Sequence, residues 1–208
     1  MLQRMDAQER LIVATERLVA EQGVDVSLRE IALAAGQRNN SAVHYHFGSR
    51  DGLLAAVLER RNAAMEQQRL TMLAEHEVRG RGDDVRELLA MLVGPMLTVP
   101  YDEGSTHYAR FLEQVRNHPV LARPDLSAEH WPAVQILTAR LHRAVAALTG
   151  LADDRVRRRL VSMASVMFAL LADAERRRGR TTRPQDVDEV LTMLAGLLTA
   201  VPEEARAR

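Results

Sequence analysis

The sequence predicts an all-α protein of about nine helices, in which a three-helix head precedes a larger helical part. Aromatic residues make up only 3% of the chain, so Leu, Ala, Val and Met must fill the core, and this composition favours helices over sheets. Apolar residues recur at helical spacing in successive segments, which glycines and prolines separate. With 208 residues and 47% hydrophobic content, the chain can bury a sizeable core.

The first two helices have clear ends. Residues 6–22 carry one apolar stripe and stop at Gly23. Ser27 and Glu30 have the spacing of a capping box, in which each side chain bonds the other residue's backbone N–H, so a second helix begins there. Gly36 ends it, because glycine reaches left-handed backbone angles without strain.

A further short helix is expected over residues 40–46, with Val43 turned inward and small or hydrogen-bonding side chains turned outward. Two short helices around a glycine-containing turn are typical of a helix-turn-helix. An ordinary helical hairpin is the alternative interpretation of these residues.

A long helix follows over about 49–76, opened by Ser49 as its cap. Beyond Arg61 it becomes more polar, as expected of a helix that bridges two parts of a protein. We therefore predict two domains, 1–50 and 51–208.

The remaining helices are inferred from caps and breaks. Asp83 or Asp84 caps one that runs to about Leu97. Later helices are expected at 106–117, 130–148, 153–178 and 184–201. The expected interruptions are a break at 98–105, a loop marked by Pro119 and Pro124, a stop at Gly179 and a frayed tail at 203–208.

Several functional classes are disfavoured. The chain has no cysteine, and its seven histidines form no H-E-x-x-H or similar pair, so no metal site is expected. It has no G-x-S-x-G elbow or glycine-rich phosphate loop, so we expect no catalytic residues, no cofactor and no enzyme. It has no run of 18 apolar residues and no signal-like start, so we expect no membrane association and a cytoplasmic location.

The charge pattern limits how nucleic acid could be bound. The 28 basic residues are all Arg and are balanced by 28 acidic residues, so there is no general basic coat. A binding face must depend on local placement, and Arg29, Arg38 and Arg50 fall at the expected helix-turn-helix surface.

Two motifs carry a resemblance to a known family. The run AAG at 34–36, followed by YHFGSRDGLLAAVLERR at 45–61, is similar to the DNA-binding domain of TetR-family transcriptional regulators, over about residues 6–61. The sequence departs from the family where Arg38, Asn39 and Asn40 lengthen the turn, and at His44, where the family usually carries a phosphate-binding Tyr.

The resemblance implies that a dimer places the second helix of each helix-turn-helix in successive major grooves of double-stranded DNA. Ser27, Arg29 and Arg50 would then hold phosphates. Asn40, Ser41, His44 and Tyr45 would approach bases. The full set of expected DNA-binding residues is Ser27, Arg29, Arg38, Asn39, Asn40, Ser41, His44, Tyr45, His46 and Arg50.

The last two helices are apolar over more than one narrow stripe. Such helices lie either in the middle of a monomer or against copies of themselves. The family resemblance implies dimerisation through a four-helix bundle of these helices. The residues assigned to the homodimer contact are Met163, Met167, Leu170, Leu171, Leu191, Leu194 and Leu198.

The larger domain also contains adaptable or large side chains that a small-molecule pocket could use, although plain core is the alternative. The resemblance implies that this domain encloses an apolar effector. The candidate ligand-binding residues are Met91, Met96, Tyr108, Phe111, Trp131, Met163 and Met167.

We therefore expect a ligand-responsive transcriptional regulator, a repressor that binds a palindromic operator as a homodimer and is released by a small apolar effector. Two rivals stay open. One is a helical enzyme or carrier that uses the same pocket. The other is a protein-interaction or small-molecule-binding protein that no longer reads DNA.

Overall fold

The computed structural model describes residues 6–80, 82–98, 107–122, 131–178 and 184–201. Within these ranges the chain is all-helical, with nine α-helices and no strand, which confirms the predicted class. The elements are α1 (Ala7–Gln22), α2 (Leu28–Ala34), α3 (Ser41–Phe47), α4 (Arg50–Arg79), α5 (Val85–Thr98), α6 (Tyr108–Val115), the 3-10 helix η2 (Pro119–Ala122), α7 (Pro132–Thr149), α8 (Asp153–Arg178) and α9 (Pro184–Thr199).

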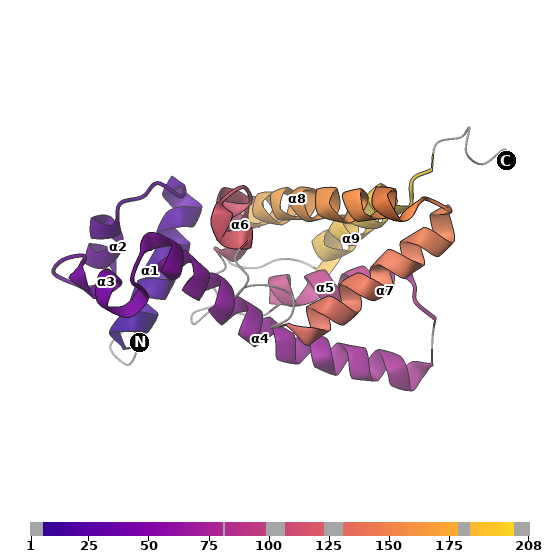
Figure 1. Cartoon of the computed structure of the whole chain (residues 1–208), viewed down its shortest axis with the longest axis horizontal. Helices are drawn as coiled ribbons and strands as arrows, with labels where there is room; N and C mark the ends of the chain where they lie inside the picture. Colours follow the sequence, from indigo (N-terminus) through magenta and orange to yellow (C-terminus); the bar gives the residue numbers. More distant parts are fainter. Residues whose placement is uncertain (1–5, 81, 99–106, 123–130, 179–183, 202–208) are drawn as a thin grey trace.

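The helices form two groups that α4 connects (Figure 1). Helices α1, α2 and α3, called the head below, lie at one end of the molecule. Helices α5 to α9, called the body, lie at the other, and α4 runs from the head along the body. Helix α6 packs on both α1 and α8, so it forms a second connection between head and body.

Local capping builds the head as the sequence predicts, with one exception. The capping box is present, since Glu30 N–H donates to Ser27 Oγ at 3.1 Å and Ser27 N–H donates to Glu30 Oε2 at 3.0 Å. Ser49 caps α4 by accepting from Gly52 N–H at 3.0 Å. The exception is α3, which begins at Ser41, one residue later than expected.

Several other boundaries differ from the expected ones. Helix α6 spans Tyr108–Val115 instead of 106–117, and α9 ends at Thr199 instead of at residue 201. Helix α4 continues to Arg79, because the left-handed residue that ends it is Gly80, with φ 60°. The segment Pro119–Ala122 forms a 3-10 turn instead of a loop. Helix α7 begins at Pro132, where a first-turn proline loses no hydrogen bond.

The cap assigned to Asp83 or Asp84 is made by Asp84, whose Oδ1 accepts from Arg86 and Glu87 N–H. The expected break at 98–105 falls almost wholly outside the described residues. Pro124, Gly179 and the tail at 203–208 also lie outside them.

One continuous apolar core joins head and body. Leu53, Leu54 and Val57, in the first turns of α4, are buried, and this part of α4 packs on α1 and α3. The core also encloses charged side chains, which include Glu16, Arg61, Glu66, Arg69 and Glu175. Among the described helices, none is both long and apolar enough to cross a membrane.

Candidate functional site

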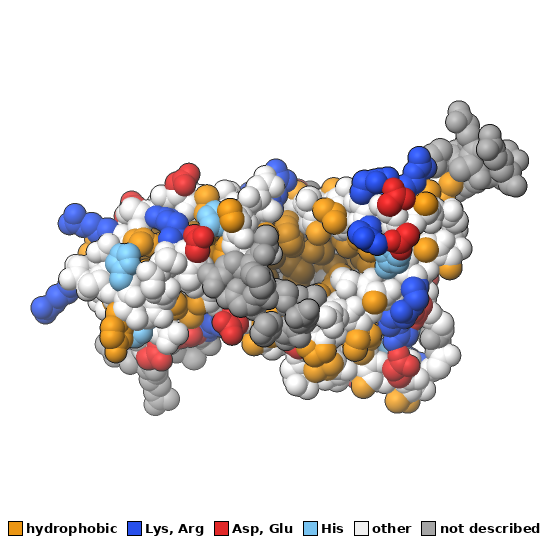
Figure 2. All heavy atoms as spheres, viewed as in Figure 1, with side chains coloured by type: hydrophobic (Ala, Val, Ile, Leu, Met, Phe, Trp, Pro, Cys, Tyr) orange, Lys and Arg blue, Asp and Glu red, His pale blue; other side chains and the backbone are white. Residues whose placement is uncertain are grey.

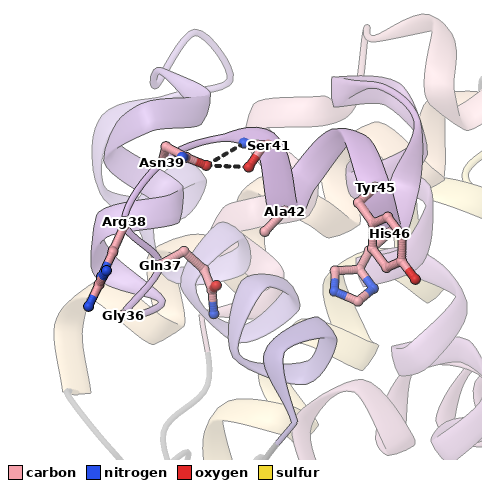
Figure 3. Close-up of a pocket in the computed structure, with 8 residues that line it drawn as sticks. All are labelled: Gly36, Gln37, Arg38, Asn39, Ser41, Ala42, Tyr45 and His46. Carbon is pink, nitrogen blue, oxygen red and sulfur yellow. Dashed lines mark hydrogen bonds between the residues drawn. The ribbon is translucent and has the colours of Figure 1, made fainter.

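An open groove of about 620 Å³ lies on the outer surface of the head, along the α2–α3 turn and the exposed side of α3 (Figure 3). Polar side chains form most of its lining. The lining residues are Gly36, Gln37, Arg38, Asn39, Ser41, Ala42, Tyr45 and His46. Val43 is fully buried on the opposite side of α3, which fixes the polar side outward.

The turn that leads into α3 is held by Asn39. Its Oδ1 accepts from Ser41 N–H at 3.0 Å and also from Ser41 Oγ (Figure 3). The side chain of Asn40, the residue at the cap position, makes no capping hydrogen bond and is exposed. Asn39 therefore supports the turn, and the amide of Asn40 keeps its donors and acceptor for other partners.

The other end of the groove is aromatic. Tyr45 is 85% exposed and packs edge-on against His46, with ring centroids 4.9 Å apart. His44 Nδ1 lies 3.3 Å from the carbonyl oxygen of Gly48. Because a carbonyl oxygen only accepts, this contact requires the proton on Nδ1, which leaves Nε2 as the acceptor of the neutral ring.

The expected phosphate contacts have different environments. Arg29 and Arg38 are exposed, and arginine side chains project from the outer end of the head (Figure 2). Arg50 is half-buried, and its Nη1 donates to the carbonyl oxygens of Val24 and Val26 at 2.8 and 2.7 Å. Arg50 thus ties the start of α4 to the α1–α2 loop.

Ser27 also makes hydrogen bonds within the head. Its hydroxyl accepts from Glu30 N–H and donates to Glu30 Oε2 at 2.6 Å. The Ser27 hydroxyl and the Ser27 backbone N–H, which both donate to the Glu30 carboxylate, lower the pKa of Glu30 from its ordinary value. The start of α2 therefore carries a carboxylate.

The groove brings together half of the expected DNA-binding residues: Arg38, Asn39, Ser41, Tyr45 and His46. Ser27, Arg29, Asn40, His44 and Arg50 are not among its lining residues. The sequence interpretation missed Gly36, Gln37 and Ala42. Gln37 follows Gly36, whose φ of 74° turns the chain into the groove, so its position next to the turn glycine was the available signal.

The interior between head and body contains a buried ion pair. Arg61 of α4 donates through Nε and Nη2 to the two carboxylate oxygens of Glu16 in α1, at 2.9 and 2.6 Å. The same guanidinium lies over the ring of Tyr108, 5.1 Å from its centroid. One side chain of α4 therefore contacts α1 of the head and α6 of the body.

The expected ligand-binding residues lie in the body. Met91, Met96, Tyr108, Phe111, Met163 and Met167 are buried, and Trp131 is half-buried at the start of α7. Tyr108 and Phe111 stack with ring centroids 6.2 Å apart, whereas the others come from α5, α7 and α8. Figure 2 shows a hollow between α7 and α8, with hydrophobic side chains on its walls.

The residues expected at the dimer contact are mostly inside the protomer. Met163, Met167, Leu171, Leu191, Leu194 and Leu198 are buried by their own chain, and Leu170 is half-buried. The sequence left two positions open for α8 and α9, the middle of a monomer or a contact between copies. The first position accounts for the burial of these side chains. The exposed apolar residues of α8 and α9 are Val161, Val166, Met193 and Leu197.

No group of three or more possible metal ligands occurs among the described residues. Glu16 of α1 accepts from Arg61, and Glu175 of α8 accepts from the backbone N–H groups of Ala109 and Arg110. Both buried carboxylates are therefore used within the fold.

Comparison with known proteins adds two family matches. Residues 11–57 match the profile of bacterial regulatory proteins of the tetR family, and residues 90–200 match that of the tetracyclin repressor-like C-terminal domain. Comparison with curated proteins gave no match.

Among solved structures, one similar chain is a TetR family transcription regulator from Marinobacter aquaeolei VT8, with a TM-score of 0.59 and 16% identity over 95% of this chain and 98% of that one. A putative TetR-family transcriptional regulator from Rhodococcus sp. gives a TM-score of 0.50 and 18% identity, over 93% and 97% of the two chains. At these identities the similarity establishes the fold.

Proposed function

Because the chain belongs to the TetR family of bacterial regulatory proteins, we propose that it is a repressor that binds a palindromic operator as a homodimer and leaves it when a small apolar effector binds. The groove along α3 is the observation that carries this proposal, since it presents polar and aromatic side chains on a helix anchored by Val43. In this proposal residues 1–50 bind DNA, and residues 51–208 hold the effector and the dimer contact.

Base recognition is assigned to the exposed residues of α3 and its turn. An asparagine amide can bond adenine with two hydrogen bonds, and Asn40 is exposed without a capping role. Ser41, Tyr45 and His44 Nε2 extend the same surface. Arg29 and Arg38 are assigned to phosphates, because both are exposed cations near this surface.

The dimer contact is assigned to Val161 and Val166 of α8 and to Met193 and Leu197 of α9. These side chains are 68%, 39%, 44% and 38% exposed. They lie on two helices that pack against each other, which suits a four-helix bundle across a two-fold axis. The buried residues named from the sequence support this face from within.

Selection of bound sequences from random duplex DNA by the purified protein tests the proposal. We expect enrichment of a palindrome whose half-sites lie about 34–36 Å apart or a multiple of that spacing. Enrichment of no palindrome would refute the DNA-reading function and favour a binding protein that has lost it. A second selection with Asn40→Ala should change the preferred base pairs within each half-site.

A further inference from the structure

Glu66 and Arg69 form an unusual polar site inside the body. They lie three residues apart on α4, and they are only 8% and 3% exposed. Their surroundings are apolar, since Met65, Leu92 and Leu137 on α4, α5 and α7 are buried and these three helices pack on one another. Long charged side chains are rarely buried in this way without full pairing.

Each side chain uses only part of its hydrogen-bonding capacity. Glu66 Oε1 accepts from Ala133 N–H at 2.6 Å, in the first turn of α7. Arg69 donates to the carbonyl oxygen of Leu92 through Nε at 3.2 Å and Nη2 at 3.0 Å. The other carboxylate oxygen of Glu66 and Nη1 of Arg69 are buried without a hydrogen-bond partner.

Trp131 adds a third unpaired group. Its Nε1 is also buried without a partner, and it precedes by two residues the Ala133 that bonds Glu66. The start of α7 therefore carries both the backbone N–H that bonds Glu66 and the residue with the unpaired indole N–H. The unpaired atoms comprise one acceptor and two donors, all from described residues.

Leaving such groups unpaired in an apolar interior costs free energy, so a bound partner is favoured. The charges of Glu66 and Arg69 are opposite and offset each other. Burial lowers the pKa of Arg69, and the negative charge of Glu66 opposes that shift. A charged partner would bring an uncompensated charge into this interior, whereas a neutral polar group would not.

We propose that Glu66, Arg69 and Trp131 form the polar end of the effector site, and that the effector is an apolar molecule with one neutral group that both accepts and donates hydrogen bonds, such as a hydroxyl or a primary amide. This inference rests on the proposed function and names the chemical class of its effector. The group accepts from Arg69 Nη1 and Trp131 Nε1 and donates to Glu66 Oε2. The apolar remainder of the molecule lies among the hydrophobic side chains of the body.

The test uses straight-chain compounds of six to twelve carbons that differ only in the end group: alcohol, primary amide, carboxylate and ammonium. Binding to the full chain is measured by the fluorescence of Trp131, the single tryptophan, and by the shift in thermal unfolding temperature. For the native protein we expect the alcohol or the amide to bind at least tenfold more tightly than both charged compounds.

Two variants should change this preference in opposite directions. Glu66→Gln leaves the Arg69 charge uncompensated, so the carboxylate should gain at least tenfold relative to the alcohol. Arg69→Gln leaves the Glu66 charge uncompensated, so the ammonium compound should gain instead. Trp131→Phe has no tryptophan fluorescence, so its binding is measured by thermal shift alone. It should bind the alcohol and the amide several-fold more weakly, with no change in the preference between the two charged compounds.

Glu175→Gln is the matched control. Glu175 is another buried carboxylate of the body, but both its oxygens accept backbone N–H groups, from Ala109 and Arg110. Its ligand preferences should match those of the native protein. Circular dichroism and the unfolding temperature without ligand identify any variant that does not fold. If either Glu66→Gln or Arg69→Gln does not fold, the charge preference is judged from the other of these two variants.

Two results would overturn the inference. One is that no compound in the series binds the native protein at millimolar concentration. The other is that the end-group preference stays the same in Glu66→Gln and Arg69→Gln, in which case the three unpaired atoms hold ordered water only. Neither result depends on DNA binding, so failure of this inference is distinguishable from failure of the DNA selection.

Discussion

The capping side chains of the head and the buried charged side chains of α4 and the body find their partners in opposite ways. In the head, the capping side chains Ser27, Asn39 and Ser49 are exposed and bond to backbone groups within three residues. In α4 and the body, Glu66, Arg69 and Glu175 are buried and bond to backbone groups on other helices. The capping groups of the head are therefore held by local contacts at its surface, whereas the buried charged groups of α4 and the body are held by contacts between helices.

The largest effect should come from the ion pair that joins the two regions. Glu16→Ala removes the carboxylate that pairs with the buried Arg61, so we expect a loss of about 3–5 kcal/mol in the free energy of unfolding, measured with urea. Glu21→Ala on the same helix is the control. Glu21 is exposed, and its contacts with Arg17 and His107 are 3.9 and 3.7 Å long, so its loss should stay below about 1 kcal/mol. Equal losses in the two variants would contradict the distinction.

The second test separates the inner and outer faces of α9. Leu197→Arg alters an exposed residue, so it should weaken the dimer by about 2 kcal/mol, or roughly thirtyfold, with little effect on folding of the protomer. Leu194→Arg places a charge in the core and should instead lower the unfolding temperature. Sedimentation at micromolar concentration and thermal unfolding distinguish them. A native protein that sediments as a monomer would rule out this dimer contact.

The third test divides the surface of the head into base and phosphate contacts. Asn40→Ala should cost about 1–3 kcal/mol per half-site at particular base pairs and relax the preference there. Because Asn40 makes no capping bond, its unfolding temperature should be unchanged.

Arg38→Ala provides the comparison. It should weaken binding to all sequences alike and lower the salt dependence by about one unit per subunit. Arg50→Ala is a poorer choice, because it also removes two hydrogen bonds to the α1–α2 loop. If Asn40→Ala and Arg38→Ala act alike on every sequence, the surface does not separate these roles.

The smallest expected effect is a pH dependence in the body. Burial raises the pKa of Glu175, and the backbone N–H groups of Ala109 and Arg110 oppose the shift. The folded state therefore takes up a proton at higher pH than the unfolded state does. As pH falls from 7 to 5, the native protein should gain stability relative to Glu175→Gln, which has no such proton to bind. A constant difference in unfolding free energy across this range would argue against the shift.

The sequence was most informative where the interactions are local. The capping box of Ser27 and Glu30 lies within four residues, so its spacing predicted both its hydrogen bonds and the start of α2. The all-α class followed from the apolar periodicity. At the α3 turn the neighbouring residues Asn39 and Asn40 are chemically equal, and only the backbone geometry decides which amide caps Ser41.

The interior of the body could not be predicted in the same way. The second half of α4 is polar, which is typical of an exposed helix, yet Glu66 and Arg69 are covered by α5 and α7. Their partners are 67 and 23 residues away, so no local pattern records them. Likewise, apolar residues on several faces of α8 and α9 do not reveal which face is covered within the protomer.

The hydrogen bonds between Arg50 and the α1–α2 loop couple the tilt of α4 to the position of the head. Because these hydrogen bonds fasten its start to the head, we expect α4 and the head to turn as one unit. Helix α4 has 30 residues, so at about 1.5 Å per residue it is about 45 Å long, and a tilt of about 5° moves one end by about 4 Å relative to the other. That displacement exceeds the rise of one base pair, about 3.4 Å. If the head binds a DNA half-site as proposed, a change of a few degrees in the body would be enough to move it out of register with that half-site.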